Sequence, residues 1–301
     1  MIQAMTITTI GRATALGVAS LAIVDAMGAA SAVETAGPDT VVEAEYAFAD
    51  SAKPLGVRGA FLKYLATDSI ICSPAPVNGV VSTAAGKANA DTLEWYPILA
   101  HTASSADLGY TTGPWTYRTA DGKTEVNGTF LSVWRKQPDG TWRVVVDCGV
   151  DHSKPAVAPK GLPRVATPAS STATAHVAPS WIDPVANADA QYTAAATRSA
   201  TAALTEFGAA EVRVLAKGAA PAIGVKAGQA ILDAHAQTFG TTWRHVFASE
   251  SGDGTLGYAW GYIGDPKSPR PAAAYVNVWQ RERAGAPWKI VAQALQVLPQ
   301  K

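Results

Sequence analysis

One carboxylate in this sequence stands where acid–base chemistry could use it. The segment TWRVVVD ends at Asp147, and its alternation of polar and apolar residues predicts a β-strand. Strict alternation would put Asp147 on the face of Arg143 and Val145, opposite Trp142 and Val144. A carboxylate held against an apolar wall has a pKa raised toward neutral pH, which suits it to remove a proton. The alternative is an outward aspartate paired with an arginine such as Arg143, because alternation alone does not say which face is concave.

Other polar residues could assist such a base. Asp107 begins a predicted strand and could be a pocket acid, although an aspartate at this place more often accepts hydrogen bonds from turn amides. Tyr110, and Tyr258 at the equivalent place later in the chain, could donate a hydroxyl to a developing oxyanion, or could simply be core tyrosines. Asp68 and Glu211 each follow a predicted helix, where a carboxylate opposes the helix dipole. This repeated misfit indicates an arginine partner or a pocket role, with a solvated helix end as the alternative.

The sequence offers no pattern for a metal or a cofactor. His235 and His245 stand ten residues apart without a cysteine or carboxylate at ligand spacing, so no metal is predicted. The sequence also has no nucleophile elbow, phosphate-binding glycine loop or dinucleotide fingerprint. Any enzyme encoded here is therefore expected to work without a cofactor.

Aromatic residues recur at equivalent places in the two halves. Trp95 matches Trp243, and Trp134 matches Trp279. Such side chains usually belong to a core, but some of them could line a pocket and stack on a flat apolar ligand. The residues predicted to contact a ligand are Tyr46, Asp68, Trp95, Trp115, Trp134, Tyr192, Trp243, Tyr258, Trp260 and Trp279.

The chain has two cysteines, Cys72 and Cys148. In an oxidising compartment they could form a disulfide. The matching positions in the second half are Leu215 and Ala294, so both cysteines are expected to be buried, and two buried free thiols are the alternative.

The order of predicted elements occurs twice. In each half, helices come first, followed by a strand, a short helix and four further strands, which is an α+β pattern. We expect two tandem domains, each with one curved antiparallel sheet wrapped around its helices. The boundaries are residues 33–152 for the first domain, 153–180 for a Pro/Ala-rich linker, and 181–301 for a divergent second domain.

Three motifs of the first half resemble a known family. They are DLGYTTGPW at 107–115, VWR at 133–135 and DGTWR at 139–143. Together they resemble the NTF2-like superfamily and, within it, the DUF4440/SnoaL-like group. The resemblance covers residues 40–151 well and 185–299 more weakly, since the second copy has Thr255 for Asp107 and Gln293 for Asp147.

This resemblance implies a cone-shaped α+β fold with a pocket, and frequent pairing of domains through their sheets. Members include ketosteroid isomerases, polyketide cyclases, dehydratases and non-enzymatic binding domains, so the fold does not choose a function. We expect the two domains to pair within the chain as a pseudo-dimer.

The N-terminus predicts export. Arg12 precedes an apolar run from Ala13 to Val24, and Ala30-Ser31-Ala32 fits a cleavage site. Residues 1–32 are therefore a predicted signal peptide, with an uncleaved anchor as the alternative, and the mature protein would be periplasmic or secreted without a stable membrane span. The chain has 24 basic and 24 acidic residues, which gives no reason to expect a nucleic-acid partner.

Two functional hypotheses follow from the sequence. The first is a binding domain with an aromatic pocket for a small apolar molecule or a peptide. The second is a lyase or isomerase, similar to the SnoaL-like and ketosteroid-isomerase-like proteins, that uses Asp147 as general base; Gln293 would leave the second copy inert.

Overall fold

The structure is a computed structural model that describes residues 40–164 and 184–299. The predicted signal peptide of residues 1–32, and the part of the predicted linker beyond residue 164, lie outside these ranges.

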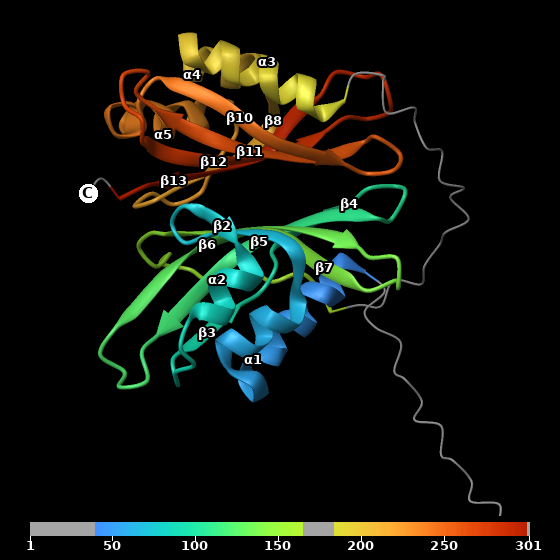
Figure 1. Ribbon diagram of the computed structural model, residues 1–301, viewed down its shortest axis with the longest axis vertical. Helices are drawn as coiled ribbons and strands as arrows, with labels where there is room; N and C mark the ends of the chain where they lie inside the picture. The colour runs from blue at the N-terminus through green and yellow to red at the C-terminus, as the bar shows by residue number, and fades with distance from the viewer. Residues whose placement is uncertain (1–39, 165–183, 300–301) are drawn as a thin grey trace, which may run out of the picture. The chain divides into compact units, whose positions relative to one another are not determined.

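The first half forms two helices and one mixed sheet (Figure 1). Its strands lie in the order β2-β1-β7-β6-β5-β3, and β4 also pairs with β5. The elements are α1 (Val41–Tyr64), β1 (Leu65–Cys72), β2 (Pro76–Asn78), α2 (Gly79–Ala85), β3 (Thr92–Trp95), β4 (Leu99–Thr102), β5 (Leu108–Arg118), β6 (Glu125–Lys136) and β7 (Trp142–Asp151).

The second half repeats this arrangement. Its strands lie in the matching order β9-β8-β13-β12-β11-β10. The elements are α3 (Val185–Arg198), α4 (Ala200–Phe207), β8 (Gly208–Ala216), β9 (Ala222–Ile223), α5 (Val225–Phe239), β10 (Thr242–Glu250), β11 (Leu256–Gly264), β12 (Pro271–Gln280) and β13 (Lys289–Val297). The predicted α+β class is confirmed.

One feature of both sheets differs from the prediction, because neither sheet is antiparallel throughout. β1 pairs in parallel with β7, and β8 pairs in parallel with β13. Each of these strands follows the helices of its half, and the whole meander that separates the two paired strands acts as the crossover connection that a parallel pair needs.

Local sequence signals explain the first helix. Thr40 and Glu43 form a reciprocal capping box at its N-terminus, which satisfies two otherwise unpaired backbone amides. The helix is kinked at Gly56, which has φ of 68°, two residues after Pro54. The break predicted around Lys53–Gly56 therefore exists, and it lets α1 follow the curvature of the sheet.

Three apolar clusters make up the core. One lies between α1 and the first sheet and contains Phe48 and Trp134, and another joins the helices of the second half to the second sheet around Tyr192. The remaining cluster contains side chains of both sheets, among them Val133 and Val278. Each sheet thus has one face toward its own helices and one face in this shared cluster.

A β-bulge in β7 decides which side chains face the helices. Val133 of β6 pairs with Val146, but the next residue, Trp134, pairs with Val144, so Val145 is the extra residue. The bulge shifts the alternation by one position, so that Asp147 and Val144 face the helices together. The strict alternation assumed from the sequence separated these two residues and is wrong at this point.

Within the parts of the chain that the structure describes, no helix combines the length and the apolar character needed to cross a membrane.

Candidate functional site

A cavity of about 340 Å³ opens on the helix-facing side of the first sheet. Its walls are mostly aromatic, and its polar groups are few, which is the usual composition of a small-molecule site. We call it the inner cavity; it is lined by Phe48, Phe61, Ile71, Cys72, Ser73, Leu93, Trp95, Trp115, Tyr117, Phe130, Ser132, Asp147 and Gly149.

Asp147 is the acidic residue of the inner cavity. Its Oδ1 accepts a hydrogen bond from the Ser132 hydroxyl at 3.0 Å, and its Oδ2 has no hydrogen-bond donor among the described residues. Burial raises the pKa of Asp147 to about 6, while the bond from Ser132 lowers it. The site thus holds a carboxylate with one uncommitted oxygen and a pKa near neutral pH, which can accept a hydrogen bond or a proton from a bound molecule.

A second buried carboxyl fixes the wall beside it. Glu45 of α1 accepts hydrogen bonds from Trp95 Nε1 at 2.6 Å, Thr111 Oγ1 at 2.5 Å and Trp134 Nε1 at 2.9 Å. The pKa of Glu45 is raised to about 7, chiefly by burial and to a smaller extent by the charge of Asp147, and the hydrogen bonds from Thr111, Trp95 and Trp134 partly offset this rise. With these bonds made, Glu45 holds the Trp95 indole in the position where it lines the cavity.

Two strand positions without side chains make room for the Trp115 indole, which forms part of the cavity wall. A Cβ at Gly128 would lie 2.4 Å from the Trp115 ring, and one at Gly149 would lie 3.1 Å from Trp115 Nε1. The indole therefore lies flat over β6 and β7, as aromatic side chains do over strand glycines. Its Nε1 is buried and has no hydrogen-bond partner within the described residues.

The equivalent space in the second half is filled. Gln293, in the register position of Asp147, is fully buried and donates to Tyr192 OH and Asn277 Oδ1, each at 2.8 Å. Leu295 occupies the register position of Gly149 and is also fully buried. The second half therefore has neither the base nor the empty volume at this place.

The first helix of the second half also has a buried carboxylate, which is Asp189 at the position equivalent to Glu45. Asp189 accepts hydrogen bonds from His245 Nδ1 at 2.7 Å, Tyr275 OH at 2.7 Å, Asn277 Nδ2 at 2.9 Å and Trp279 Nε1 at 3.1 Å. The bond from Trp279 corresponds to the bond from Trp134 to Glu45. His245 has no carboxylate near it in the sequence, because its partner comes from a helix 56 positions earlier.

Several residues predicted to act with Asp147 lie elsewhere. Tyr110 and Tyr258 are buried in the cluster shared by the two sheets, and Trp260 packs against it, so all three are separated from the inner cavity by a sheet. Tyr110 cannot serve as hydroxyl donor to a molecule bound at Asp147. The reason is geometric, since Tyr110 alternates with Thr111, whose hydroxyl reaches Glu45.

The two other predicted carboxylates also have structural partners. Asp107 accepts a hydrogen bond from the Gly252 amide at 2.7 Å, so it caps a loop of the other half. Asp68 forms an exposed ion pair with Arg135 at 2.7 Å. Neither carboxylate lines the inner cavity.

Some of the residues predicted to contact a ligand line the inner cavity, and others are buried in the core. Trp95 and Trp115 line the inner cavity. Trp134, Trp243 and Trp279 belong to the helix-facing cores. Tyr192 is core as well, and Tyr46 donates its hydroxyl to the Leu162 carbonyl at 2.6 Å.

Cys72 and Cys148 form a disulfide, which settles the two alternatives drawn from the sequence. Ile71 pairs with Asp147 in the parallel ladder between β1 and β7, so the two cysteines are the next residues along each strand. The disulfide therefore fixes β7 directly beside the candidate base.

Sequence reasoning missed Glu45 and Ser132. Glu45 looks like an ordinary helix residue, and its only signal is that Asp189 holds the same place relative to the first helix of the second half. Ser132 lies two residues before Trp134, and strand alternation could have placed it beside Asp147 once the register was known.

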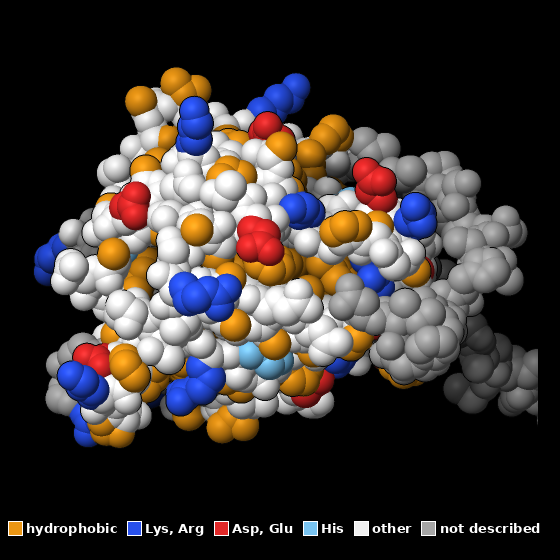
Figure 2. All heavy atoms as spheres, turned by 90° about the horizontal axis from the view of Figure 1, so that it is seen from above, with side chains coloured by type: hydrophobic (Ala, Val, Ile, Leu, Met, Phe, Trp, Pro, Cys, Tyr) orange, Lys and Arg blue, Asp and Glu red, His pale blue; other side chains and the backbone are white. Residues whose placement is uncertain are grey.

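Within residues 40–164 and 184–299, no group of three or more His, Cys, Asp or Glu side chains could hold a metal ion. On the face shown in Figure 2, basic and acidic side chains are interspersed rather than gathered by sign.

Comparison with known proteins gives structural likeness without sequence likeness. No family model and no curated protein matches the chain. An NTF2-like protein with a cystatin-like fold from Novosphingobium aromaticivorans is 19% identical, with 39% of this chain and 81% of that chain covered and a TM-score of 0.31. An NTF2-like superfamily protein from Salmonella enterica serovar Typhimurium is 18% identical, with coverage of 39% and 92% and a TM-score of 0.32. A ketosteroid isomerase-like protein from Erwinia carotovora atroseptica is 17% identical, with coverage of 38% and 95% and a TM-score of 0.30.

Proposed function

We propose that the first half is an NTF2-like domain that binds a small, largely apolar molecule in the inner cavity. The observation that carries this proposal is the half-buried Asp147 carboxylate, which has one uncommitted oxygen and lines a cavity of about 340 Å³ with aromatic walls. A pocket of this size, with apolar walls and one oriented polar group, suits a compact ligand of one to three rings.

The side chains that line the inner cavity indicate which class of ligand it would bind. Phe48, Trp95, Trp115 and Phe130 offer flat apolar surface, which favours a ring system over a flexible polar chain. With a pKa of about 6, Asp147 is mostly ionised at pH 7 and accepts a hydrogen bond from a ligand hydroxyl. A phenol or another weakly acidic hydroxyl on an apolar ring meets both requirements.

The second candidate function is cofactor-independent proton transfer by Asp147, in an isomerase or lyase. The raised pKa favours it, because a general base works best when its pKa lies near the working pH. Such an enzyme also needs a donor for the developing oxyanion. Among the described side chains of the inner cavity, the Ser132 and Tyr117 hydroxyls already donate to Asp147 and Asp91, which leaves Ser73 and the buried Nε1 of Trp115 as the donors of the cavity. We place binding first because it needs only the Asp147 acceptor and the apolar walls.

We further propose that the protein is exported and that its two halves pair through their sheets. The disulfide supports export, since such bonds persist in oxidising compartments. The shared apolar cluster supports pairing, and the Gln296 amide donates to the Gly149 carbonyl at 2.6 Å, so the second half braces a strand of the inner cavity.

Binding is tested with 2-naphthol, a ring system with one weakly acidic hydroxyl, titrated by fluorescence or calorimetry. We expect Asp147→Asn to weaken binding at least about tenfold through loss of a charge-assisted hydrogen bond. Gly149→Leu, which copies the second half, should abolish binding because it fills the cavity. Asp68→Asn is the matched control, since it removes an exposed carboxylate of the same domain and should change nothing. Equal affinity for wild type and both cavity variants would refute the proposal.

Proton transfer is tested separately. Cyclic ketones are incubated with the protein in D₂O, and deuterium uptake beside the carbonyl is followed by NMR. Uptake that is lost in Asp147→Asn and kept in Asp68→Asn would make the domain an enzyme. If 2-naphthol binds but no ketone exchanges faster than in buffer, the domain is a binding module.

A further inference from the structure

The segment that follows β7 packs back onto the first domain. Tyr96 donates its hydroxyl to the Pro159 carbonyl at 2.9 Å, and the Leu162 amide donates to the Pro97 carbonyl at 2.8 Å. The hydroxyl of Tyr46 in α1 donates to the Leu162 carbonyl. We call residues 154–164 the strap. Its few large apolar residues placed it in the predicted linker of residues 153–180; in the structure, its backbone groups at Pro159 and Leu162 make the three hydrogen bonds that hold its middle part.

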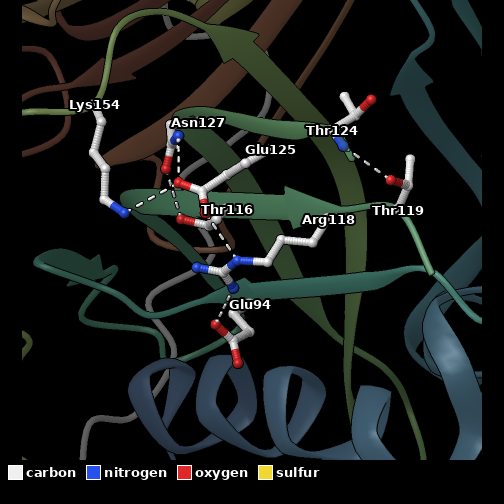
Figure 3. Close-up of polar contacts among 8 residues, drawn as sticks. All are labelled: Glu94, Thr116, Arg118, Thr119, Thr124, Glu125, Asn127 and Lys154. Carbon is white, nitrogen blue, oxygen red and sulfur yellow. Dashed lines mark hydrogen bonds and ion pairs between the residues drawn. The ribbon is translucent and has the colours of Figure 1, made fainter. Parts of the chain in front are cut away.

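Both ends of the strap are anchored by charge. At its start, Lys154 Nζ lies 3.1 Å from Glu125 Oε1 on β6, within the network of polar contacts drawn in Figure 3. At its end, Arg164 pairs with Asp50 of α1, and its guanidinium lies 4.0 Å from the centroid of the Tyr46 ring. Each of these exposed pairs is weak by itself, but together with the three hydrogen bonds they fix a defined path.

The strap forms one wall of a second, partly open cavity of about 770 Å³, which we call the outer chamber. The strap residues that line it include Pro155, Ala156 and Ala158. Leu93, Trp95 and Trp115 line both cavities, so the outer chamber and the inner cavity are neighbours that share these three side chains as a wall.

The charges of the outer chamber are balanced and largely satisfied within the protein. Three acidic residues (Asp50, Asp91, Glu94) and three basic residues (Lys53, Lys154, Arg164) line it. Asp50 pairs with Arg164, Glu94 with Arg118 and Lys154 with Glu125, and Asp91 accepts from Asn89, Tyr117 and the Ala120 amide. Asn89, Thr92, Thr116 and Asn127 add neutral polar groups to the lining. A chamber of this composition does not attract an ion of either sign, but it offers many hydrogen bonds to hydroxyl groups.

We propose that the strap completes a two-chamber site, in which the outer chamber takes the neutral, hydroxyl-bearing end of an elongated ligand whose apolar ring lies in the inner cavity. This inference rests on the proposed binding function and extends it by naming the ligand class, an apolar ring compound that carries a sugar-like substituent. The Trp95 and Trp115 indoles, at the junction, contact the link between the two ends.

The test uses three probes that share one ring system: 2,6-dihydroxynaphthalene, its monoglucoside and its monophosphate. All three keep a free ring hydroxyl for Asp147, and they differ only in what would enter the outer chamber. We expect the glucoside to bind wild type at least about tenfold more tightly than the diol, and the phosphate to gain nothing. A phosphate that binds more tightly than the glucoside would overturn the assignment of a neutral substituent.

A matched pair of strap variants locates the effect. Ala158→Trp places an indole in the outer chamber, whereas Val157→Trp changes a neighbouring residue that is 83% exposed and does not line it. Ala158→Trp should remove the advantage of the glucoside and leave the diol unaffected, and Val157→Trp should alter neither. If the diol binds in an Asp147-dependent way but Ala158→Trp does not affect the glucoside, the outer chamber is refuted and the inner site stands. If none of the probes binds, both proposals fall.

Discussion

Gln293 Nε2 donates a hydrogen bond to the hydroxyl of Tyr192 at 2.8 Å, at the place where the first half leaves open space beside Asp147. The strand pairings are equivalent, because Ser132 faces Asp147 across β6 and β7 as Asn277 faces Gln293 across β12 and β13. One fold thus contains a cavity in one copy and a buried amide at the equivalent place in the other. Both side chains keep one oxygen without a hydrogen-bond donor among the described residues, but Gln293 Oε1 is sealed in the core, whereas Asp147 lines a cavity from which a bound molecule could donate to it.

The unfolding free energy should fall as pH rises from about 4 to 7. Burial raises the pKa of Asp147 from 3.8 to about 6 and that of Glu45 from 4.5 to about 7, so the folded state binds more protons than the unfolded state across this range. Stability contributed by a raised carboxyl pKa is present at low pH and is lost as pH increases through the folded-state pKa. For Asp147 the loss is of the order of 2–3 kcal/mol, since one pKa unit corresponds to about 1.4 kcal/mol.

Urea denaturation at pH 5 and pH 8 measures this difference, and Asp147→Asn should reduce it because its amide does not titrate. A wild type as stable at pH 8 as at pH 5 would show that these carboxyls titrate normally in the folded protein.

The hydrogen bond between Trp134 and Glu45 should appear as an energetic coupling. A double-mutant cycle of Trp134→Phe and Glu45→Gln is expected to give a coupling energy of about 1 kcal/mol or more, because a buried carboxylate loses a charge-assisted donor. Trp115→Phe is the matched control, since the indole N–H of Trp115 has no partner among the described residues. Its cycle with Glu45→Gln should give a coupling near zero, and equal couplings in the two cycles would contradict the network.

Loss of the disulfide should destabilise the first half. Cys72 and Cys148 are 76 positions apart, and a cross-link that closes a loop of this length typically contributes about 2–4 kcal/mol. We expect Cys72→Ala/Cys148→Ala to lower the denaturation midpoint and dithiothreitol to do the same to wild type only. Intact-mass measurement with and without reduction before alkylation checks the bond directly. A midpoint that neither change moves would show that the bond adds no stability.

The two sheets should depend on each other for solubility. A fragment of residues 36–164 retains the strap but exposes Val133, Val146 and the other first-half members of the shared cluster. We expect it to self-associate through this face, whereas the full chain remains monomeric. Light scattering coupled to size-exclusion chromatography measures both, and a fragment that stays monomeric at high concentration would argue against pairing as the role of that face.

The outline of the fold could be predicted because it depends on local signals. The helix break at Pro54 and Gly56 and the correspondence of Asp147 with Gln293 follow from residue types and their repetition. The direction of Asp147 did not follow, because the one-residue bulge at Val145 reverses the face of every later side chain in β7. A bulge depends on the hydrogen-bond register between two paired strands, and the residues of neither strand alone indicate it.

The sequence by itself therefore determined that this chain builds one α+β unit twice, and that the first copy has a carboxylate, Asp147, where the second has the amide Gln293. Tertiary structure alone decided that Asp147 lines a cavity, that Tyr110 and Asp107 contact the other half, and that the strap lines a second chamber. The physical reason is the distance along the chain over which each kind of interaction acts. Capping, strand alternation and glycine conformations act over a few residues, whereas the burial that sets the pKa of Asp147, and the hydrogen bond that ties Tyr46 to Leu162, come from residues far apart in the chain.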